Sequence, residues 1–302
     1  MKIGKIFFFK LLIFLLFVQI SFYPQTESLQ KKIEQIAKTV KGNVGVAIIG
    51  VGNNDTITFN GNEKFPMQSV YKFPLALAVL NSVDKGRLSL DQKIFIAKKD
   101  LLPATWSPLR EKYPDGNVSV TLDELLKVTV AWSDNNGCDI LFRLVGGTNI
   151  VNDFIHEKGV TNIEITATEE EMHKDAQVQF SNWSTPSAMA VLLCSFFHGN
   201  ILSKKSTNYL MEIMAKTSTG TKRIKGLLPE GIRVAHKTGS SGRNEQGVIE
   251  ALNDSGIVTL PNGDHFVIVA FISNTKEEEA VCESVIAQIA KVVWDQNISQ
   301  DE

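Results

Sequence analysis

The chain has 302 residues, which is enough for one large domain or two packed lobes. Hydrophobic residues make up 43% and charged residues 21% of it, values typical of a soluble globular protein, and there is no internal repeat or low-complexity segment. The net charge of −2 at pH 7 gives no electrostatic basis for binding nucleic acid or an anionic membrane surface.

The first residues predict a secretory signal. Two lysines precede an apolar stretch, Ile6 to Phe22, whose longest unbroken run is Leu11–Val18. A transmembrane anchor is the alternative, but this run is far shorter than the roughly 20 residues that span a bilayer. No cysteine lies near the expected cleavage site, which argues against a lipid anchor. We therefore expect a signal peptide over residues 1–24 and export to the periplasm.

The predicted elements of the mature chain fall into three blocks. A surface helix over 29–40 is followed by β-like segments at 45–49 and 56–59, which the turn-forming residues 52–55 separate. From about Ser69 to Leu210 helical patterns dominate. Helices are predicted at 73–83, 121–131, 139–144, 150–157 and 186–197. After about Gly231 the pattern is β-like again, with strands at 248–251, 257–260 and 266–272, a hairpin turn at 261–264 and a closing helix at 277–293.

This order predicts an α+β fold. Because β segments occur at both ends, the economical arrangement is one antiparallel sheet built from both chain ends, with flanking terminal helices and an inserted all-helical lobe. We expect one domain over 25–302, with an α/β lobe formed by 25–66 and 215–302 and a helical lobe formed by 67–214.

Ser69-Val70-Tyr71-Lys72 opens the first central helix and is a candidate nucleophile motif. A serine hydroxyl needs an adjacent base to react, and on a helix Lys72 shares the face of Ser69. Backbone N–H groups at a helix start also favour developing negative charge. Taken alone, the tetrapeptide favours an N-cap serine and a solvent-facing lysine, and only the further elements below reverse that interpretation.

Two further polar strings are candidates for the same site. Ser133-Asp134-Asn135 begins a polar segment between two apolar helices, where ordinary loop chemistry is the alternative. Lys237-Thr238-Gly239-Ser240 follows an edge-strand pattern. A lysine there can anchor a substrate carboxylate, and Gly239 removes side-chain bulk where a ligand approaches the backbone.

Glu169 is the remaining candidate. It begins the run Glu169-Glu170-Glu171, and composition alone does not distinguish the three from a solvated acidic surface. Ser-x-x-Lys, Ser-Asp-Asn, a glutamate and Lys-Thr-Gly, in this order, are the signature of class A β-lactamases and penicillin-binding proteins. The chain thus resembles a class A serine β-lactamase over nearly all of its mature length, and that family has the layout predicted above. Alignment to the family selects Glu169. This residue lies 14 residues before Trp183, which marks the end of the omega loop.

The resemblance implies how the catalytic residues act. Ser69 is the nucleophile, Ser133 passes a proton to the ring nitrogen, and Asn135 holds the substrate side-chain amide and Lys72. Glu169 activates the water that hydrolyses the acyl-enzyme; whether Lys72 or Glu169 is the base for acylation is left open.

The resemblance also implies a carboxylate site and an oxyanion hole. Lys237, Thr238 and Ser240 bind the substrate carboxylate, and the backbone N–H groups of Ser69 and Ser240 form the oxyanion hole. The family's usual arginine beyond the Lys-Thr-Gly strand is not clearly matched, and Arg223 is the candidate replacement. Trp106 matches an aromatic gatekeeper at the mouth of the cleft; packing in the core or on the surface is its alternative role.

Several positions depart from the common family pattern. His173 replaces the asparagine that helps to hold the water, and Ala167 and Asn182 stand where an arginine–aspartate pair clamps the omega loop. Segments at 133–140, 167–173 and 177–179 are similar to the PER and VEB-type branch, which handles expanded-spectrum cephalosporins. Our hypothesis is a wider omega-loop rim that admits oxyimino side chains.

We expect no metal and no cofactor, because the five histidines are scattered and form no zinc-binding spacing. The expected partner is a small-molecule β-lactam, with no nucleic acid, no membrane contact after signal removal, and a monomeric protein. Two alternative functions share the serine and lysine elements. A penicillin-binding D-alanyl-D-alanine peptidase generally lacks the deacylating glutamate, and a β-lactam sensor domain normally follows a multi-span membrane segment.

Overall fold

The computed structural model describes residues 24–50 and 55–299. The predicted signal peptide, residues 1–24, lies outside this range except for its last residue, as does most of the predicted turn 52–55. Within the described ranges, no helix combines the length and the apolar character needed to cross a bilayer.

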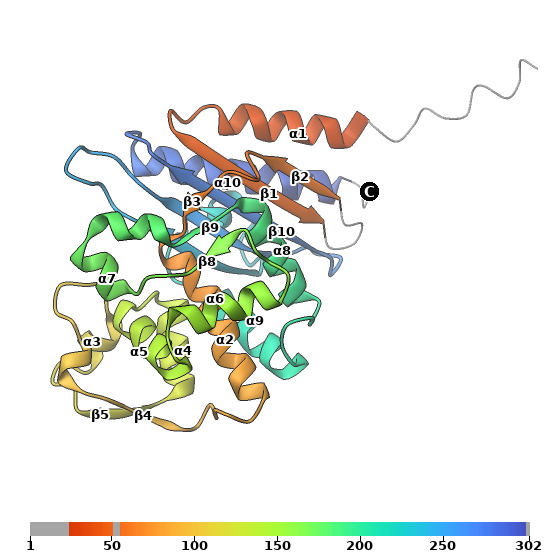
Figure 1. The fold of residues 1–302 in the computed structure, drawn as a ribbon. Helices are drawn as coiled ribbons and strands as arrows, with labels where there is room; N and C mark the ends of the chain where they lie inside the picture. Colours follow the sequence, from red (N-terminus) through yellow and green to blue (C-terminus); the bar gives the residue numbers. More distant parts are fainter. Residues whose placement is uncertain (1–23, 51–54, 300–302) are drawn as a thin grey trace, which may run out of the picture.

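A five-stranded antiparallel sheet is assembled from both ends of the chain (Figure 1). Its strands are β1 Asn43–Gly50, β2 Thr56–Phe59, β8 Val234–Ser240, β9 Leu252–Thr259 and β10 His265–Ser273. The spatial order is β2-β1-β10-β9-β8, so β1 pairs with the last strand, and β8 lies at an edge. The predicted α+β fold is confirmed.

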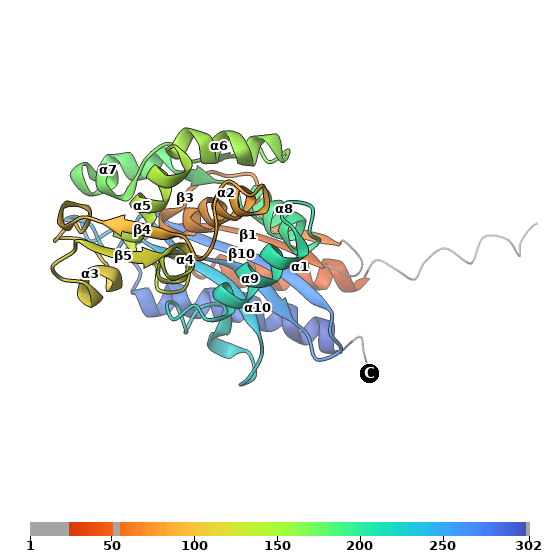
Figure 2. The same ribbon diagram turned by 90° about the horizontal axis from the view of Figure 1, so that it is seen from below.

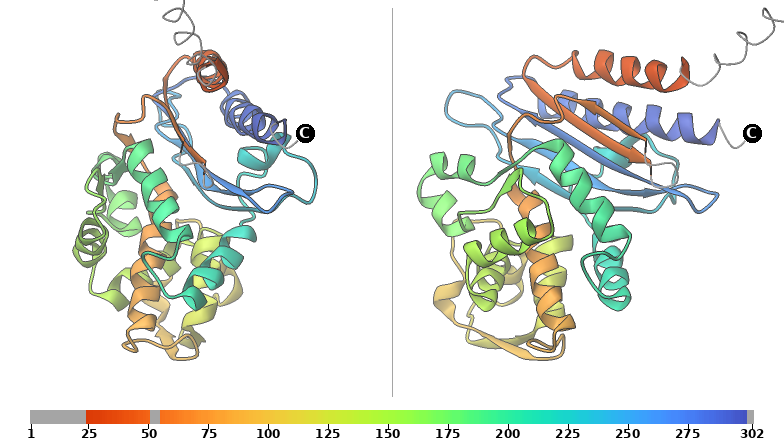
Figure 3. Two further views of the ribbon diagram at one scale, coloured as in Figure 1. Left: turned by 90° about the vertical axis from the view of Figure 1, so that its right-hand side faces the viewer. Right: turned by 45° about the vertical axis from the view of Figure 1, so that its right-hand side comes forward.

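Helices cover both faces of this sheet (Figures 2 and 3). On one face α1 Pro24–Ala37 and α10 Glu279–Ile298 lie side by side. Val234 and Val258 belong to the apolar cluster on that side, whereas Ala235 and Ile257 belong to the cluster shared with the helices on the other side. This alternation, expected of a sheet buried on both faces, assigns each side chain of β8 and β9 to one layer.

The other face carries the helices that lie between β2 and β8 in the sequence. They are α2 Lys72–Asp84, α3 Pro108–Lys112, α4 Leu122–Ala131, α5 Asn135–Val145, α6 Thr148–Glu157, α7 Glu169–Lys174, α8 Pro186–Phe197 and α9 Lys204–Ala215. Short 3₁₀ turns occur at η1 Gln68–Tyr71, η2 Lys98–Asp100, η3 Ala176–Ser181 and η4 Ile224–Leu227. Two small sheets, not predicted, are formed by β3 Phe65–Pro66, β7 Trp183–Ser184 and β6 Ile163–Glu164, and by β4 Lys93–Ile96 and β5 Val118–Thr121.

The prediction of two separate strands at 248–251 and 257–260 is wrong. The strand is β9, Leu252–Thr259, and Ile249 makes only isolated bridges before it. The centre of β9 is Asn253-Asp254-Ser255-Gly256, a polar run that reads as a turn, yet all four residues are buried. Asn253 and Asp254 hydrogen-bond to neighbouring segments, so polarity here marks tertiary contacts rather than exposure.

The polar segment 133–137 is only partly a loop. Residues from Asn135 onward form the first turn of α5, because Asp134 caps that helix and accepts the N–H of Gly137 at 2.7 Å. The carboxylate also accepts the N–H of Leu109 at 2.6 Å and the hydroxyl of Ser107 at 3.0 Å. Burial raises the pKa of Asp134, and these hydrogen bonds oppose that rise.

Candidate active site

Ser69 lies in the 3₁₀ turn η1, immediately before α2. The prediction that it opens the α-helix itself is wrong by this one turn, because Gln68 adopts a left-handed conformation (φ 49°) and the regular helix begins at Lys72. Val70 and Tyr71 are buried, while Ser69 is half-buried. The turn is therefore anchored in the core by Val70 and Tyr71, while Ser69 stays partly exposed.

Strand β8 approaches this turn closely at Gly239. A Cβ there would collide with the carbonyl oxygen of Met67 and lie 3.2 Å from the backbone nitrogen of Ser69. The adjacent strand also holds the turn, since Asn253 Nδ2 donates to the carbonyl of Pro66 at 2.8 Å. Glycine is thus required by the approach of two backbone segments, and this approach brings together the segments of Ser69 and Ser240.

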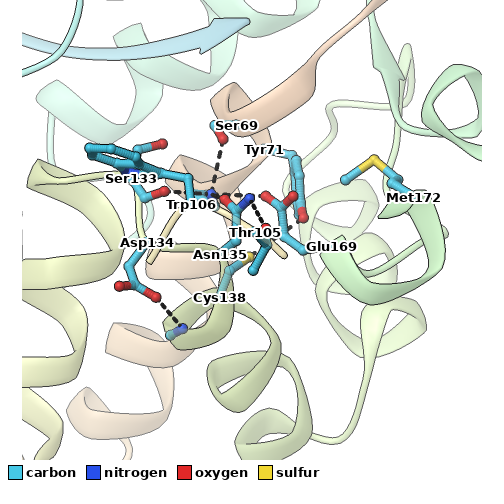
Figure 4. A network of polar contacts seen from close by, with 12 residues as sticks. Ser69, Tyr71, Thr105, Trp106, Ser133, Asp134, Asn135, Cys138, Glu169 and Met172 are labelled. Atoms are coloured by element: carbon cyan, nitrogen blue, oxygen red, sulfur yellow. Dashed lines mark hydrogen bonds and ion pairs between the residues drawn. The ribbon is translucent and has the colours of Figure 1, made fainter. Parts of the chain in front are cut away.

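Figure 4 shows Ser69, Ser133, Asn135 and Glu169 gathered in one polar cluster, and Lys72 contacts all four of them. Its fully buried Nζ lies 2.9 Å from Ser69 Oγ, 2.5 Å from Asn135 Oδ1 and 3.0 Å from the Ser133 carbonyl oxygen. Glu169 Oε1 lies 2.8 Å from the same nitrogen as an ion pair. Three segments of the chain, which contain Ser69, Ser133 with Asn135, and Glu169, therefore converge on one ammonium group.

The three consecutive glutamates have different partners. Thr168 caps α7, and its reciprocal bonds with Glu171 form a capping box. Glu170 is paired with Lys174 at 2.7 Å on the surface. Only Glu169, whose side chain is 11% exposed, faces Lys72. Their positions in the first turn of a short helix separate three residues that composition could not distinguish.

Asp139 holds the start of α7 and is absent from the sequence-based candidates. Its carboxylate accepts the backbone N–H groups of Glu169 at 2.8 Å and Glu170 at 2.9 Å. Burial raises its pKa to about 6, and these two hydrogen bonds oppose the rise. An acidic residue directly before the apolar run Ile140-Leu141-Phe142 was the available signal, because such a position is rarely acidic without a partner.

Ser133 and Lys237 form the side of the cluster next to β8. Helix α4 ends at Ala131, and Ser133 follows in a left-handed conformation (φ 59°) that turns the chain into α5. Lys237 Nζ donates to Ser133 Oγ at 2.9 Å and to the carbonyl of Thr238 at 2.9 Å. Burial and the nearby Lys72 hold the pKa of Lys237 well below its usual value. Lys72 and Lys237 thus lie on either side of Ser133.

Arg223, the candidate replacement for the family's arginine, lies beside the end of β8. It is 4% exposed, and its guanidinium donates to Ser240 Oγ at 2.7 Å and to the carbonyl of Asn253 at 3.0 Å. Glu279 and Glu283 of α10 lie 3.4 Å from it.

Thr238 is buried, with its Oγ1 2.5 Å from that of Thr219, and Ser240 is exposed at the strand end. The structure places these two side chains on the same strand as Lys237, beside Arg223.

Trp106 and His173 occupy the periphery. Trp106 is 57% exposed, its Nε1–H donates to the carbonyl of Trp132 at 2.8 Å, and its backbone carbonyl accepts the N–H of Asn135. It therefore lies beside the Asn135 segment. His173 is exposed in the last turn of α7, and across residues 24–50 and 55–299 no hydrogen bond joins it to the Lys72 cluster.

Asn182 holds the omega loop, residues 163–182. It stands at one of the two positions where members of the class A family have an arginine–aspartate ion pair, which the sequence predicts to be absent here. Its buried amide accepts the N–H groups of Thr166 at 2.8 Å and Ala167 at 2.9 Å. It also donates to the carbonyl of Ala167 at 2.8 Å. Neutral hydrogen bonds between one side chain and the backbone thus connect the two ends of the loop.

No group of three or more histidine, cysteine, aspartate or glutamate side chains suited to a metal ion occurs in the part of the chain that the structure describes.

Comparisons with known proteins give one consistent result. A sequence model of the "Beta-lactamase enzyme family" matches residues 28–297. The chain is 47% identical over 272 residues to "Beta-lactamase VEB-1" of Pseudomonas aeruginosa, covering 89% of this chain and 90% of that one. It is 40% identical over 270 residues to "Extended-spectrum beta-lactamase PER-1" of the same organism, covering 89% and 87%.

Solved structures agree. The crystal structure of TLA-1 extended-spectrum β-lactamase superposes with a TM-score of 0.89 at 55% identity, covering 91% of this chain and all of that one. A β-lactamase from Chitinophaga pinensis superposes with a TM-score of 0.88 at 54% identity, covering 89% and 99%. With the family model matched over residues 28–297, and with a serine, two lysines and a glutamate gathered at one site, this chain belongs to the class A β-lactamases, which hydrolyse β-lactams, alongside the VEB-1, PER-1 and TLA-1 enzymes.

Proposed function

We propose that this enzyme hydrolyses penicillins and cephalosporins, including oxyimino-cephalosporins, through an acyl-enzyme on Ser69 that Glu169 helps to hydrolyse. The observation that supports this most is the position of Lys72 Nζ, which contacts Ser69 Oγ and pairs with Glu169 Oε1. A nucleophile and two groups that can accept its proton lie within one hydrogen-bonded cluster.

In the first half-reaction Ser69 Oγ attacks the lactam carbonyl carbon and loses its proton either through a water to Glu169, or to Lys72 once the Lys72 ammonium has passed its own proton to Glu169. The carbonyl oxygen takes up negative charge between the backbone N–H groups of Ser69 and Ser240. The carbon–nitrogen bond then breaks, and Ser133 gives its proton to the ring nitrogen, with Lys237 at 2.9 Å as the neighbouring cation. The proton taken from Ser69 passes from Glu169 through Lys72 to Ser133, which restores the Ser133 hydroxyl and the Glu169 carboxylate. The product is an ester of Ser69.

In the second half-reaction Glu169 removes a proton from a water that attacks the ester carbonyl. The carbon–oxygen bond to Ser69 breaks, Ser69 recovers its proton, and the ring-opened acid leaves. Glu169 suits this task because α7 presents it toward Lys72, and Asp139 fixes the backbone from which it projects. Removal of a general base typically costs about 10²–10⁴-fold in rate.

Stopped-flow absorbance with a chromogenic cephalosporin tests this assignment. Wild-type protein is expected to give many turnovers, whereas Glu169→Ala gives about one equivalent of product and then stalls. Glu170→Ala is the matched control, because that neighbour pairs with Lys174 on the surface and should turn over like wild type. A single-equivalent burst from the wild type as well would instead favour a penicillin-binding peptidase or a sensor domain.

The inclusion of oxyimino substrates is supported by two observations. Asn182 connects the omega loop through neutral hydrogen bonds in place of an ion pair, and one relative bears the name "Extended-spectrum beta-lactamase PER-1". We expect steady-state turnover of cefotaxime and ceftazidime as well as benzylpenicillin. Hydrolysis of benzylpenicillin with neither cephalosporin touched contradicts this part of the proposal.

We further propose that the mature enzyme is an exported, periplasmic monomer. The basic and apolar pattern of the first residues supports export. Cell fractionation and N-terminal sequencing of the exported protein test the compartment and the cleavage site, and light scattering tests the oligomeric state.

A further inference from the structure

A buried histidine–aspartate pair lies outside the chemistry described so far. His236 of β8 and Asp254 of β9 are both fully buried, and the two carboxylate oxygens lie 2.9 and 3.0 Å from His236 Nδ1. Burying two polar side chains of this kind is costly unless they satisfy each other. A pair of this kind next to Lys237 calls for a role.

The pair projects to the face of the sheet that carries η4 and α10. Val234 and Val258 pack in the cluster on that face, and His236 and Asp254 share their alternation along the strands. Lys237 projects the opposite way, toward Ser133. The pair is therefore behind the strand, across the sheet from the Ser69 cluster.

The sequence of β9 makes room for this histidine. Gly256 is the residue paired with His236, and a Cβ on it would lie 2.6 Å from the His236 Cβ and 2.9 Å from the His236 Cα. Contacts this short do not occur, so a side chain at 256 would displace the histidine or the strand. Glycine at this one position keeps His236 in reach of Asp254.

Asp254 connects two segments that carry cations. One carboxylate oxygen accepts from His236, whose neighbour is Lys237, and Oδ2 also lies 3.2 Å from the N–H of Ile224, whose neighbour is Arg223. Arg223 in turn donates to the carbonyl of Asn253, the residue before Asp254. A single carboxylate thus ties β8 and η4 to β9, and fixes the spacing of Lys237 and Arg223.

We propose that Asp254 and His236 are positioning residues, which set Lys237 and Arg223 as a two-point receptor for the carboxylate of the β-lactam. This inference rests on the proposed function of the same site. It assigns the affinity for the substrate carboxylate partly to residues that never touch the substrate.

The charges around Lys237 support this arrangement. Lys72 on α2 disfavours the Lys237 cation, whereas Asp254 on β9 and Glu169 on α7 act in the opposite direction and raise its pKa. Burial raises the pKa of the Cys138 thiol on α5 well above its usual value, so this neighbour adds no charge. Lys225 of η4, half-buried, is also within the field of Asp254, which raises the pKa that burial lowers. Asp254 is therefore the principal opposing charge on the far side of β8.

The first experiment compares Asp254→Asn with wild type on benzylpenicillin and on its methyl ester, which lacks the free carboxylate. We expect kcat/KM for the free acid to fall about tenfold or more, mainly through a higher KM. The reason is that the variant lacks the negative charge of the Asp254 carboxylate, which positions Lys237 and Arg223. With the ester the two enzymes should differ by less than about twofold. An equal loss on both substrates, or no loss on the free acid in folded protein, overturns the inference.

The pH dependence supplies a readout that a purely structural role would not move. Without the Asp254 charge the pKa of Lys237 falls further, so the alkaline limb of kcat/KM should shift to lower pH in Asp254→Asn. His236→Gln retains both a donor to Asp254 and the carboxylate, and should leave that limb and KM close to wild type. An unshifted limb in Asp254→Asn contradicts the electrostatic part of the inference.

Asp84→Asn is the matched control. This variant also removes a hydrogen-bonded carboxylate. The Asp84 carboxylate accepts from the Ser203 and Ser206 hydroxyls at the start of α9, and it lies at the opposite end of α2 from Ser69. The variant should lower the melting temperature without changing KM. If Asp254→Asn does not fold, His236→Leu against His236→Gln makes the same comparison, with a higher KM expected only for leucine. A wild type that fails to turn over the free acid overturns the proposed function and this inference together; a normal wild type with normal variants overturns this inference alone.

Discussion

The two sides of the Ser69 cluster are held by different means. On one side Glu169 projects from the short helix α7. The side chain of Asp139 accepts the backbone N–H of Glu169, and the side chain of Asn182 accepts the backbone N–H of Ala167 just before the helix. On the other side Lys237 projects from β8, which pairs with β9 over its whole length. Loop geometry that depends on single side chains is more sensitive to substitution than geometry enforced by a row of backbone hydrogen bonds. The deacylating side should therefore be the easier one to damage.

Lys72 connects the two sides, and its removal should have the largest effect. In Lys72→Met the buried ammonium that contacts Ser69, Asn135 and Glu169 is lost, leaving the Glu169 carboxylate without its cation. We expect acylation by benzylpenicillin to slow about 10³-fold or more, as measured by mass spectrometry of the acyl-enzyme. Lys127→Met, which removes an exposed lysine paired with Asp123, is the control and should acylate normally. Rapid acylation of Lys72→Met would show that the cation is dispensable.

Asn182→Ala tests the side built from a loop. Three hydrogen bonds to the backbone of Thr166 and Ala167 are removed at a fully buried position. We expect a loss of about 2–4 kcal/mol in the free energy of unfolding, since each such bond contributes about 1 kcal/mol and buried groups are left unsatisfied. Because the loop carries Glu169, kcat should fall more than KM rises. Asn297→Ala removes one hydrogen bond, which the side-chain amide donates to the carbonyl of Val293 near the end of α10. This variant should lose less stability than Asn182→Ala and keep the wild-type kcat.

Asp139→Asn gives a smaller effect that depends on pH. The folded-state pKa of Asp139 is about 6, above its ordinary value of 3.8, so the folded protein binds the proton more tightly than the unfolded chain. Between about pH 6 and 4 the free energy of unfolding therefore rises as pH falls, by at most about 3 kcal/mol from this group. Asparagine abolishes that contribution, so urea unfolding of Asp139→Asn should show a flatter dependence across this window.

Asp153→Asn, at an exposed position of α6, should retain the wild-type pH dependence. A wild-type protein whose stability does not change between pH 6 and pH 4 relative to Asp139→Asn would mean that Asp139 is ionised throughout. The start of α7 would then depend less on the protonation state of one side chain, and the two sides of the cluster would be closer in their sensitivity to pH.

The sequence by itself determined the fold class and the segments that could carry chemistry. Strand patterns at both ends with helices between them predicted an antiparallel sheet built from both chain ends, and the three-residue spacing of Ser69 and Lys72 already placed both on one side of a helical turn. These are local or periodic properties, which backbone geometry turns into structure wherever they occur. Assignment of Glu169 needed the family resemblance, because three adjacent glutamates have the same chemistry and differ only in where their side chains point in the folded protein.

Only the tertiary structure decided what the buried polar residues do. Asp139, His236 and Asp254 were not among the sequence-based candidates, and the polar centre of β9 concealed a strand. Their partners are distant in the sequence, so no local pattern specifies them: Asp139 meets the start of α7, and Asp254 meets β8 and η4. A buried polar side chain is stable only with such partners, and packing of the whole chain alone brings the partners within hydrogen-bond distance.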